Sequence, residues 1–143
     1  KKIFYQTINE IPKMLEKSNE RHDRIENALS KLGLQVISKV TKKCSTPRVA
    51  FLVSKGIKTD LINYLDDKNI ETGVWFDHVP KLMGNSPGSN LGNTVKLMDQ
   101  VVNLSCHWTI SDTEMNRLIK SLNLFFGEEK TVFPQEIKKE KVF

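Results

Sequence analysis

The chain has 143 residues, 38% hydrophobic and 27% charged, which suits one globular domain with a single core. This composition excludes a disordered chain, and no run approaches the roughly 20 apolar residues of a membrane span. The net charge of +5 comes entirely from residues 1–43, which hold 10 Lys and Arg against 5 Asp and Glu. A nucleic-acid surface would pair such charge with clustered aromatics or a known module, and neither is present. We expect a solvated basic helix face, with neither nucleic acid nor a membrane as partner.

Cysteines and histidines are few and dispersed. The two cysteines, Cys44 and Cys106, form no CxxC pair, which favours the reduced cytoplasm over a disulfide scaffold. The three histidines, His22, His78 and His107, are interpreted as lacking a Cys or carboxylate at ligand spacing, so no metal site is expected. The chain begins with neither Met nor a secretory signal, and we expect a cytoplasmic chain trimmed or excerpted from a longer one.

The first predicted element is a long helix from about residue 10 to 32. Pro12 is expected in its first turn, where a missing N–H costs nothing, and Gly33 is expected to end it. A stripe at steps of four and three marks one face, polar only at its middle: Ile11, Leu15, Ser18, His22, Ile25, Leu29 and Leu32. Such a gap is tolerated in a helix that leaves its domain or crosses between two domains.

Three strands and a helix are predicted next. Residues 34–38 form the first strand, and residues 49–53 form a second, more buried one. A helix follows near residues 58–68, and Asn69 is expected to cap it in the left-handed conformation. Residues 72–76 are predicted as the third strand.

The rest of the chain holds an exposed loop, a short helix, an apolar strand and a final helix. Residues 80–90 are dense in turn residues, and a short helix near residues 93–100 leads into the apolar residues 101–104. Ser111–Glu114 is a capping box that opens the last helix, which Gly127 is expected to stop. The core face of that helix is predicted to carry Met115, Leu118, Ile119, Leu122 and Phe126.

This order of elements predicts an α+β fold. We expect a small, mostly antiparallel sheet with helices packed mainly on one face, preceded by a long N-terminal helix. The domain prediction is an interdomain-type helix at residues 1–33, a small α+β domain at residues 34–127 and a tail at residues 128–143.

Most motifs that suggest chemistry are weak. The Gly84–Gly92 segment lacks the Lys-Ser/Thr of a P-loop and is predicted to be a surface loop. A Cys106-His107 nucleophile pair fails because adjacent strand residues point to opposite faces, so Cys106 is expected in the core. The carboxylates of Asp66 and Asp67 close a helix and are expected to be solvated.

One cluster, Trp75–Pro80, gathers aromatic, carboxylate and imidazole groups where a strand runs into a loop. Such strand ends often line binding sites. The alternative is a strand end with half-buried aromatics, whose Asp and His only hydrogen-bond the turn. The residues alone leave both interpretations open.

Three stretches in order, residues 70–76, the loop to Pro80 and beyond, and residues 102–115, carry a family resemblance. They resemble the C-terminal, small domain of the DegT-type, PLP-dependent sugar aminotransferases of fold type I. There a Gly-Ile-x-Thr-x-x-x-Tyr segment precedes a substrate-facing loop, and Leu-Pro-x-His and Leu-Ser-x-x-Glu lead into the last helix. The long helix and Leu34–Ile37 resemble the family's interdomain helix and first small-domain strand.

The chain departs from the family pattern at three places. Asn69 stands where Gly is usual, and Ser105 replaces the Pro before His107. Trp75-Phe76-Asp77-His78 replaces the more frequent His-Tyr-x-x-Pro-x-His run. The fold expectation survives these departures, whereas inferences about the substrate from this loop do not.

The resemblance implies an aminotransferase that moves an amino group from a donor such as glutamate to a keto sugar on a nucleotide carrier. PLP would be the cofactor of the full-length enzyme, and its lysine, pyridine partner and phosphate cup would belong to an N-terminal domain absent here. The chain alone would then hold no catalytic residue, bind no cofactor and form one wall of the cleft. Trp75 and His78 would face the sugar, and His107 would fix the turn before the last helix. The implied partners are the N-terminal domain and the second subunit of a homodimer.

Two alternatives stay open. The chain is a stand-alone, non-catalytic interaction module that docks partners through its basic first helix, or it belongs to a PLP-fold sugar dehydratase whose catalytic lysine is replaced. The position that decides on the dehydratase lies outside this chain.

Overall fold

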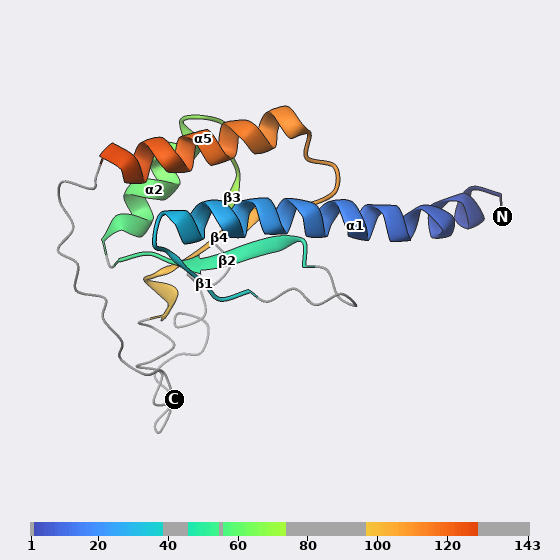
Figure 1. Cartoon of the computed structure of the whole chain (residues 1–143), viewed down its shortest axis with the longest axis horizontal. Coiled ribbons are helices and arrows are strands. Elements are labelled where there is room, and N and C mark those ends of the chain that lie inside the picture. Colours follow the sequence, from blue (N-terminus) through green and yellow to red (C-terminus); the bar gives the residue numbers. More distant parts are fainter. Residues whose placement is uncertain (1, 39–45, 55, 74–96, 129–143) are drawn as a thin grey trace, which may run out of the picture.

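The structure, a computed structural model, describes residues 2–38, 46–54, 56–73 and 97–128. In these residues the chain is an α+β fold with a long first helix, as predicted (Figure 1). Its elements in order are α1 (Lys2–Lys31), β1 (Gln35–Val36), β2 (Arg48–Leu52), α2 (Ile57–Asp66), β3 (Thr72–Gly73), β4 (Val101–Ser105) and α5 (Asp112–Glu128). None of these helices is long and apolar enough to cross a membrane.

The four strands form one sheet in the order β1-β2-β4-β3, and every neighbouring pair is antiparallel. The longest pairing joins β2 to β4, with Arg48 opposite Ser105 and Leu52 opposite Val101. Because β2 and β3 both run antiparallel to β4, they run parallel to each other, and α2 lies in the connection between them.

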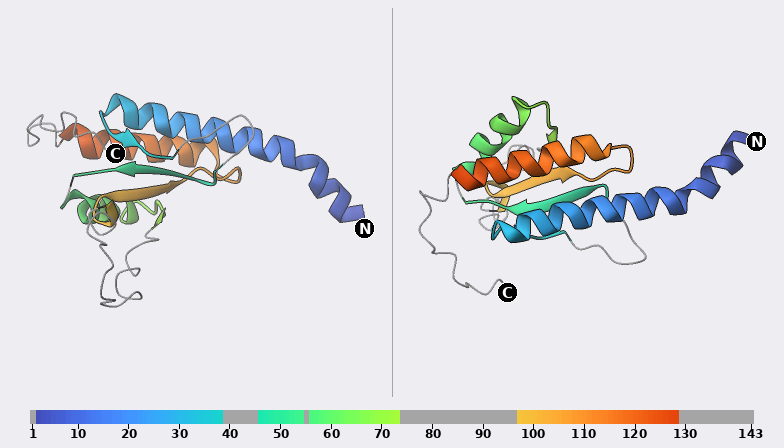
Figure 2. Two further views of the ribbon diagram at one scale, coloured as in Figure 1. Left: turned by 90° about the horizontal axis from the view of Figure 1, so that it is seen from below. Right: turned by 45° about the horizontal axis from the view of Figure 1, so that its top comes forward.

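Helices α1 and α5 lie side by side on one face of the sheet (Figure 2). Helix α2 packs against α5, where the rings of Tyr64 and Phe125 lie 5.1 Å apart between centroids. The apolar face of α5 is buried as its periodicity predicts, with Ile119 only partly so. The core between sheet and helices includes Ile25, Leu29, Val49, Phe51, Leu61, Leu65, Val102, Leu104, Met115 and Leu122.

Local end signals of the first two helices behave as predicted. Gly33 ends α1 with a φ of 78°, and the N–H groups of Leu34 and Gly33 donate to the carbonyls of Leu29 and Ser30, each at 3.0 Å. This pair of hydrogen bonds is the Schellman motif, which requires a residue in the left-handed conformation. Asn69 takes the predicted left-handed conformation after α2, with a φ of 53°.

Two helix boundaries were predicted wrongly. Helix α1 begins at Lys2 rather than near residue 10, so Pro12 lies inside it and not in its first turn. The N-terminal part of α1 is bent (Figure 2). Pro12 explains a bend in this helix, because a proline removes one helical hydrogen bond and its ring clashes with the preceding turn. Gly127 does not stop α5, since the helix continues to Glu128 and Gly127 has no positive φ.

The edge strand β1 is shorter than predicted. β1 covers two of the five predicted residues, although Ile37 and Ser38 still donate N–H groups to the carbonyl of Ala50. β3 covers Thr72–Gly73, and the rest of the predicted third strand, the loop at 80–90 and most of the predicted short helix lie outside the described residues.

Candidate functional site

The two residues predicted to face a substrate, Trp75 and His78, lie in the segment 74–96, outside the described residues. The last described residue before them, Gly73, is paired with Asn103 in β4. His107 lies two residues beyond the end of β4 at Ser105.

His107 lies in the short turn between β4 and α5. Its Nδ1 atom is 2.8 Å from the Oγ1 atom of Thr109, and its carbonyl accepts the N–H of Ile110 at 3.1 Å. Its neighbour Cys106 is fully buried, as predicted, and the thiol donates to the carbonyl of Thr46 at 3.0 Å. These contacts are compatible with a turn-fixing His107, whose relation to a substrate stays a prediction.

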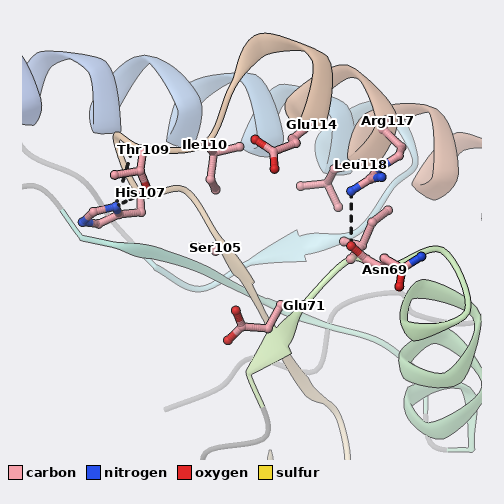
Figure 3. A pocket seen from close by; sticks show the side chains of 10 residues that line it. Asn69, Glu71, Ser105, His107, Thr109, Ile110, Glu114, Arg117 and Leu118 are labelled. Atoms are coloured by element: carbon pink, nitrogen blue, oxygen red, sulfur yellow. Dashed lines mark hydrogen bonds between the residues drawn. The ribbon is translucent and has the colours of Figure 1, made fainter.

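An open pocket of about 350 Å³ lies between the segment that precedes β3, the end of β4 with the turn after it, and the first turns of α5 (Figure 3). It was not predicted from the sequence, because its lining comes from three separate stretches that only the sheet pairing brings together. The lining residues are Asn69, Ile70, Glu71, Ser105, His107, Thr109, Ile110, Glu114, Arg117 and Leu118.

The charged groups of this pocket already make structural contacts. Arg117 donates to the carbonyl of Asn69 at 3.2 Å, and Glu71 pairs with Arg48 at 3.4 Å. Glu114 accepts the side-chain hydroxyl and the backbone N–H of Ser111, and these two hydrogen bonds lower the pKa of its carboxyl group. The charged side chains that line the pocket are therefore held in place by contacts within the described structure.

A polar contact between α1 and the start of α5 is centred on Arg21, which is 1% exposed. Its guanidinium donates to the carbonyl of Ile110, through Nε at 2.7 Å and also through one terminal nitrogen. Arg24, one turn later, pairs with Asp112 at 2.9 Å and donates to Asn116 at 2.7 Å. The expectation of a simply solvated basic face is wrong for these two residues. Arg21 lies on the Ser18–Ile25 face, and that spacing was an available signal.

The stripe along α1 is buried at its polar middle and exposed at its apolar start. Ser18 and His22 are 5% and 0% exposed, whereas Ile11 and Leu15 are 44% and 45% exposed, and Ile8 is similar. The exposed part borders an apolar groove of about 260 Å³ beside the turn after β4. The groove is lined by Ile11, Met14, Leu15, Ser18, Pro47, His107 and Trp108.

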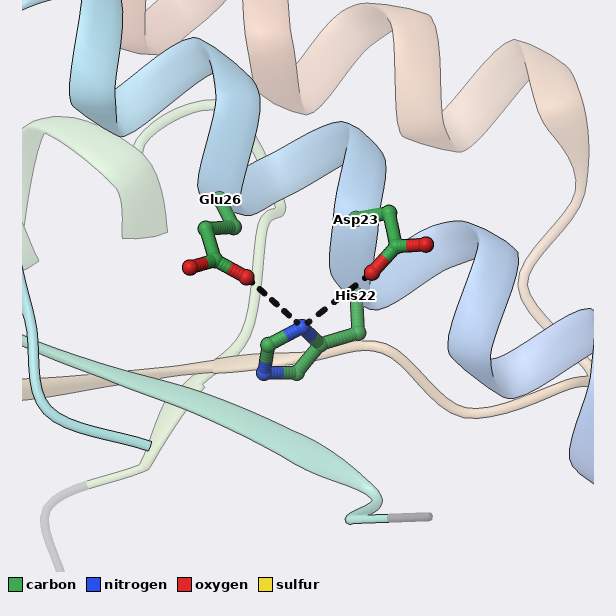
Figure 4. A group of neighbouring side chains, drawn as sticks. All are labelled: His22, Asp23 and Glu26. Atoms are coloured by element: carbon green, nitrogen blue, oxygen red, sulfur yellow. Dashed lines mark ion pairs between the residues drawn. The ribbon is translucent and has the colours of Figure 1, made fainter. Parts of the chain in front are cut away.

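His22 also corrects the interpretation that the histidines lack neighbouring carboxylates. Its Nδ1 atom lies 3.5 Å from a carboxylate oxygen of Glu26 and 3.9 Å from one of Asp23 (Figure 4). Glu26 is four residues further along the chain, which is one helical turn, so the sequence carried this signal.

The fold and these surfaces agree with a family match. A model described as the DegT/DnrJ/EryC1/StrS aminotransferase family matches residues 3–123. The chain belongs to this aminotransferase family.

Solved structures show the same fold at low sequence identity. An aminotransferase of the same family description from Brucella abortus is 15% identical with a TM-score of 0.70, over 86% of this chain and 34% of that one. The aminotransferase TlmJ from Streptoalloteichus hindustanus is 15% identical with a TM-score of 0.71, over 84% and 34%. The putative sugar aminotransferase Spr1654 from Streptococcus pneumoniae, in a PMP form, is 16% identical with a TM-score of 0.71, over 85% and 33%. The chain thus spans about a third of these structures. No curated protein sequence matches it.

The pocket beside α5 does not fit a PLP site. Such a site needs a lysine amine for the Schiff base and donors for the phosphate group. The pocket beside α5 is lined by no lysine, and its Arg117 is engaged with a backbone carbonyl. Lys58 donates to the carbonyl of Met98 at 2.9 Å, and Lys68 lies over the ring of Tyr64.

Proposed function

We propose that the chain is the C-terminal, small domain of a PLP-dependent aminotransferase that acts on a nucleotide-linked keto sugar. Membership of the aminotransferase family supports the reaction class, and coverage of about a third of the solved structures supports a partial domain. The PMP form described for the Streptococcus pneumoniae protein supports PLP as cofactor of the longer enzyme. The catalytic lysine would then belong to an N-terminal domain outside residues 1–143.

The exposed apolar start of α1 is the observation that carries this proposal. Ile8, Ile11 and Leu15 are each more than 40% exposed and repeat at helical spacing in the N-terminal half of α1. The N-terminal part of α1 extends beyond the sheet (Figure 1). Aligned apolar side chains next to an apolar groove are typical of a surface that another domain covers. We infer that the N-terminal domain covers it, with residues 1–33 as the helix between the domains.

The chain's own part in the reaction would be to bind and orient. Trp75 and His78 would contact the sugar from the segment after β3, and His107 would hold the turn between β4 and α5. Residues 34–127 would form one wall of the cleft, residues 128–143 a tail, and a second subunit would complete a homodimer. We further propose a cytoplasmic location, on the ground of two widely separated cysteines.

The alternatives use the same described residues differently. A stand-alone interaction module would present the exposed start of α1 to a different partner, and a sugar dehydratase would lack the lysine in its N-terminal domain. Sequencing the coding region upstream of Lys1 separates the three. A strand-and-helix domain with a Schiff-base lysine supports the aminotransferase, the same domain without that lysine supports the dehydratase, and a stop codon supports the module.

The biochemical test compares the 143-residue chain with the longer gene product. We expect a PLP absorbance band and glutamate-dependent amination of a nucleotide-linked keto sugar in the longer protein, and neither in the chain alone. A PLP band in the purified chain would show that our location of the cofactor site is wrong. In the longer protein, Trp75→Ala and His78→Ala are expected to raise KM for the sugar without removing the PLP band.

A further inference from the structure

We propose that His22, Asp23 and Glu26 on α1 form a binding site for one divalent transition-metal ion of the Zn²⁺ class. The three ligand atoms lie within 4.8 Å of one another (Figure 4). This inference rests on α1 and its contacts with the sheet, and it does not depend on the proposed aminotransferase function.

The imidazole ring of His22 is held in a fixed orientation. The side chain is fully buried, and its Nε2 atom lies 3.2 Å from the hydroxyl oxygen of Ser38. The same hydroxyl oxygen accepts the N–H of Ala50 at 3.1 Å, which ties it to β2. Outer contacts of this kind orient a metal-binding histidine through the nitrogen that does not bind the metal.

The other ring nitrogen, Nδ1, has no hydrogen-bond partner among the described residues although it is buried. It faces two carboxylate groups, from Glu26 at 3.5 Å and from Asp23 at 3.9 Å. When Nε2 donates its proton to Ser38, Nδ1 presents a lone pair toward these two anions. In this tautomer a cation between Nδ1 and the carboxylates would be favourable, because it would bind the buried lone pair and offset the two negative charges.

The separations suit a metal ion better than a direct hydrogen bond. Zinc binds nitrogen and oxygen at about 2.0–2.2 Å, so ligand atoms around a tetrahedral ion lie about 3.3–3.5 Å apart. The distance from Nδ1 to Glu26 is already in this range, whereas the 3.9 Å distance to Asp23 must shorten by a few tenths of an ångström. The two carboxylate oxygens, which lie within 4.8 Å of each other, would have to approach to the same range. One imidazole with two carboxylates suits Zn²⁺ or Co²⁺, whereas Ca²⁺ and Mg²⁺ prefer oxygen alone.

The position of the site indicates a structural role. The carboxylates of Asp23 and Glu26 are 68% and 46% exposed, so water can reach the ion and complete its coordination. Through His22, Ser38 and Ala50, a bound ion would link the middle of α1 to the first two strands. Because it would bind the folded chain and not the unfolded one, it would raise the melting temperature.

The test is calorimetric titration of the metal-free chain with Zn²⁺, and with Co²⁺ followed by its visible absorption. We expect one saturable site and Co²⁺ bands typical of nitrogen and oxygen ligands. Glu26→Gln keeps the shape of the side chain and removes a charged ligand, so it should weaken binding at least about tenfold and reduce the Co²⁺ bands. Glu20→Gln is the matched control, because Glu20 is an exposed glutamate on the same helix outside the cluster, and it should bind like the wild type.

Asp23→Asn provides a second variant that leaves the buried imidazole in place, since His22→Ala risks unfolding the chain. It too should weaken Zn²⁺ binding. The proposal is overturned if the wild-type chain shows no saturable binding, or if Glu26→Gln and Asp23→Asn both bind as the Glu20→Gln control does. It is equally overturned if nitrogen NMR shows that Zn²⁺ leaves the Nδ1 resonance of His22 unchanged.

Discussion

At the scale of single residues, Arg21 connects α1 to the turn before α5 by hydrogen bonds to the carbonyl of Ile110. Arg21→Met keeps the length of the aliphatic stem and removes these charged hydrogen bonds, leaving a carbonyl without its partner. We expect a loss of about 1.5–3 kcal/mol in the free energy of unfolding, measured by urea denaturation. Arg24→Met is the control, because its pairing with the exposed Asp112 is worth at most about 1 kcal/mol. Equal losses in both variants would contradict the special role of Arg21.

Cys106 is the second residue for which the surrounding structure predicts a measurable property, the pKa of its thiol. Burial raises the pKa of its thiol from 9.0 to about 11, against a smaller lowering by the nearby charge of Arg48. Since the unfolded thiol loses its proton first, the stability that the neutral thiol contributes is complete below pH 9. It is lost as the pH rises from 9 to about 11.

The corresponding experiment uses a Cys44→Ser variant, in which Cys106 is the remaining thiol. Iodoacetamide should label Cys106 slowly in the folded chain below pH 9 and rapidly in denaturant, because the thiolate is the reacting form. Mass spectrometry measures the labelled fraction. Fast labelling of the folded chain would contradict the burial and the raised pKa.

At the scale of elements, the capping box makes α5 the helix with the most local support at its start. The Glu114 N–H donates to the hydroxyl of Ser111 at 3.2 Å, and the Ser111 N–H donates to Glu114 at 2.8 Å. Ser111→Ala should lower the stability by about 1 kcal/mol in thermal or urea unfolding at neutral pH. Thr113→Ala, an exposed change in the same turn, is the control and should have a smaller effect.

The capping box also predicts a pH dependence. Hydrogen bonds from Ser111 lower the pKa of Glu114 from 4.5, so its contribution is complete above pH 4.5 and is lost as the pH falls further. The difference between wild type and Ser111→Ala should therefore shrink in acid. If the difference in stability stays constant down to the lowest accessible pH, the contribution of Ser111 does not depend on the charge of Glu114, and the prediction is wrong.

What the sequence predicts well at this scale is what neighbouring residues determine. The left-handed helix ends at Gly33 and Asn69 and the capping box at Ser111 each depend only on residues within a few positions of that site. The partner of Arg21 is different: helical spacing places Arg21 on the buried face of α1, but Ile110 is 89 residues away and only the packing of α1 on α5 brings the two together. The open pocket beside β3 was missed for the same reason, since strand pairing creates it.

At the scale of the whole molecule, the two halves of α1 differ in how much of their apolar surface the rest of the structure buries. The C-terminal half of α1 contributes Ile25 and Leu29 to the core, whereas its N-terminal half presents apolar side chains to solvent beside a groove. The proposed N-terminal domain would explain this asymmetry, because a domain separated from its neighbour exposes the surface that the neighbour would cover.

This explanation makes opposite predictions for the chain alone and for the longer protein. In the chain alone, the double variant Ile11→Gln and Leu15→Gln should change the stability by no more than about 0.5 kcal/mol, because both side chains are already largely in water. In the longer protein the same change should cost about 1.5–3 kcal/mol for each side chain that the N-terminal domain buries. Thermal unfolding of both proteins measures the contrast. Leu124→Gln on α5, which is 42% exposed, is the control and should have the same small effect in both. If the double variant leaves the longer protein as stable as the wild type, the N-terminal domain does not cover this face.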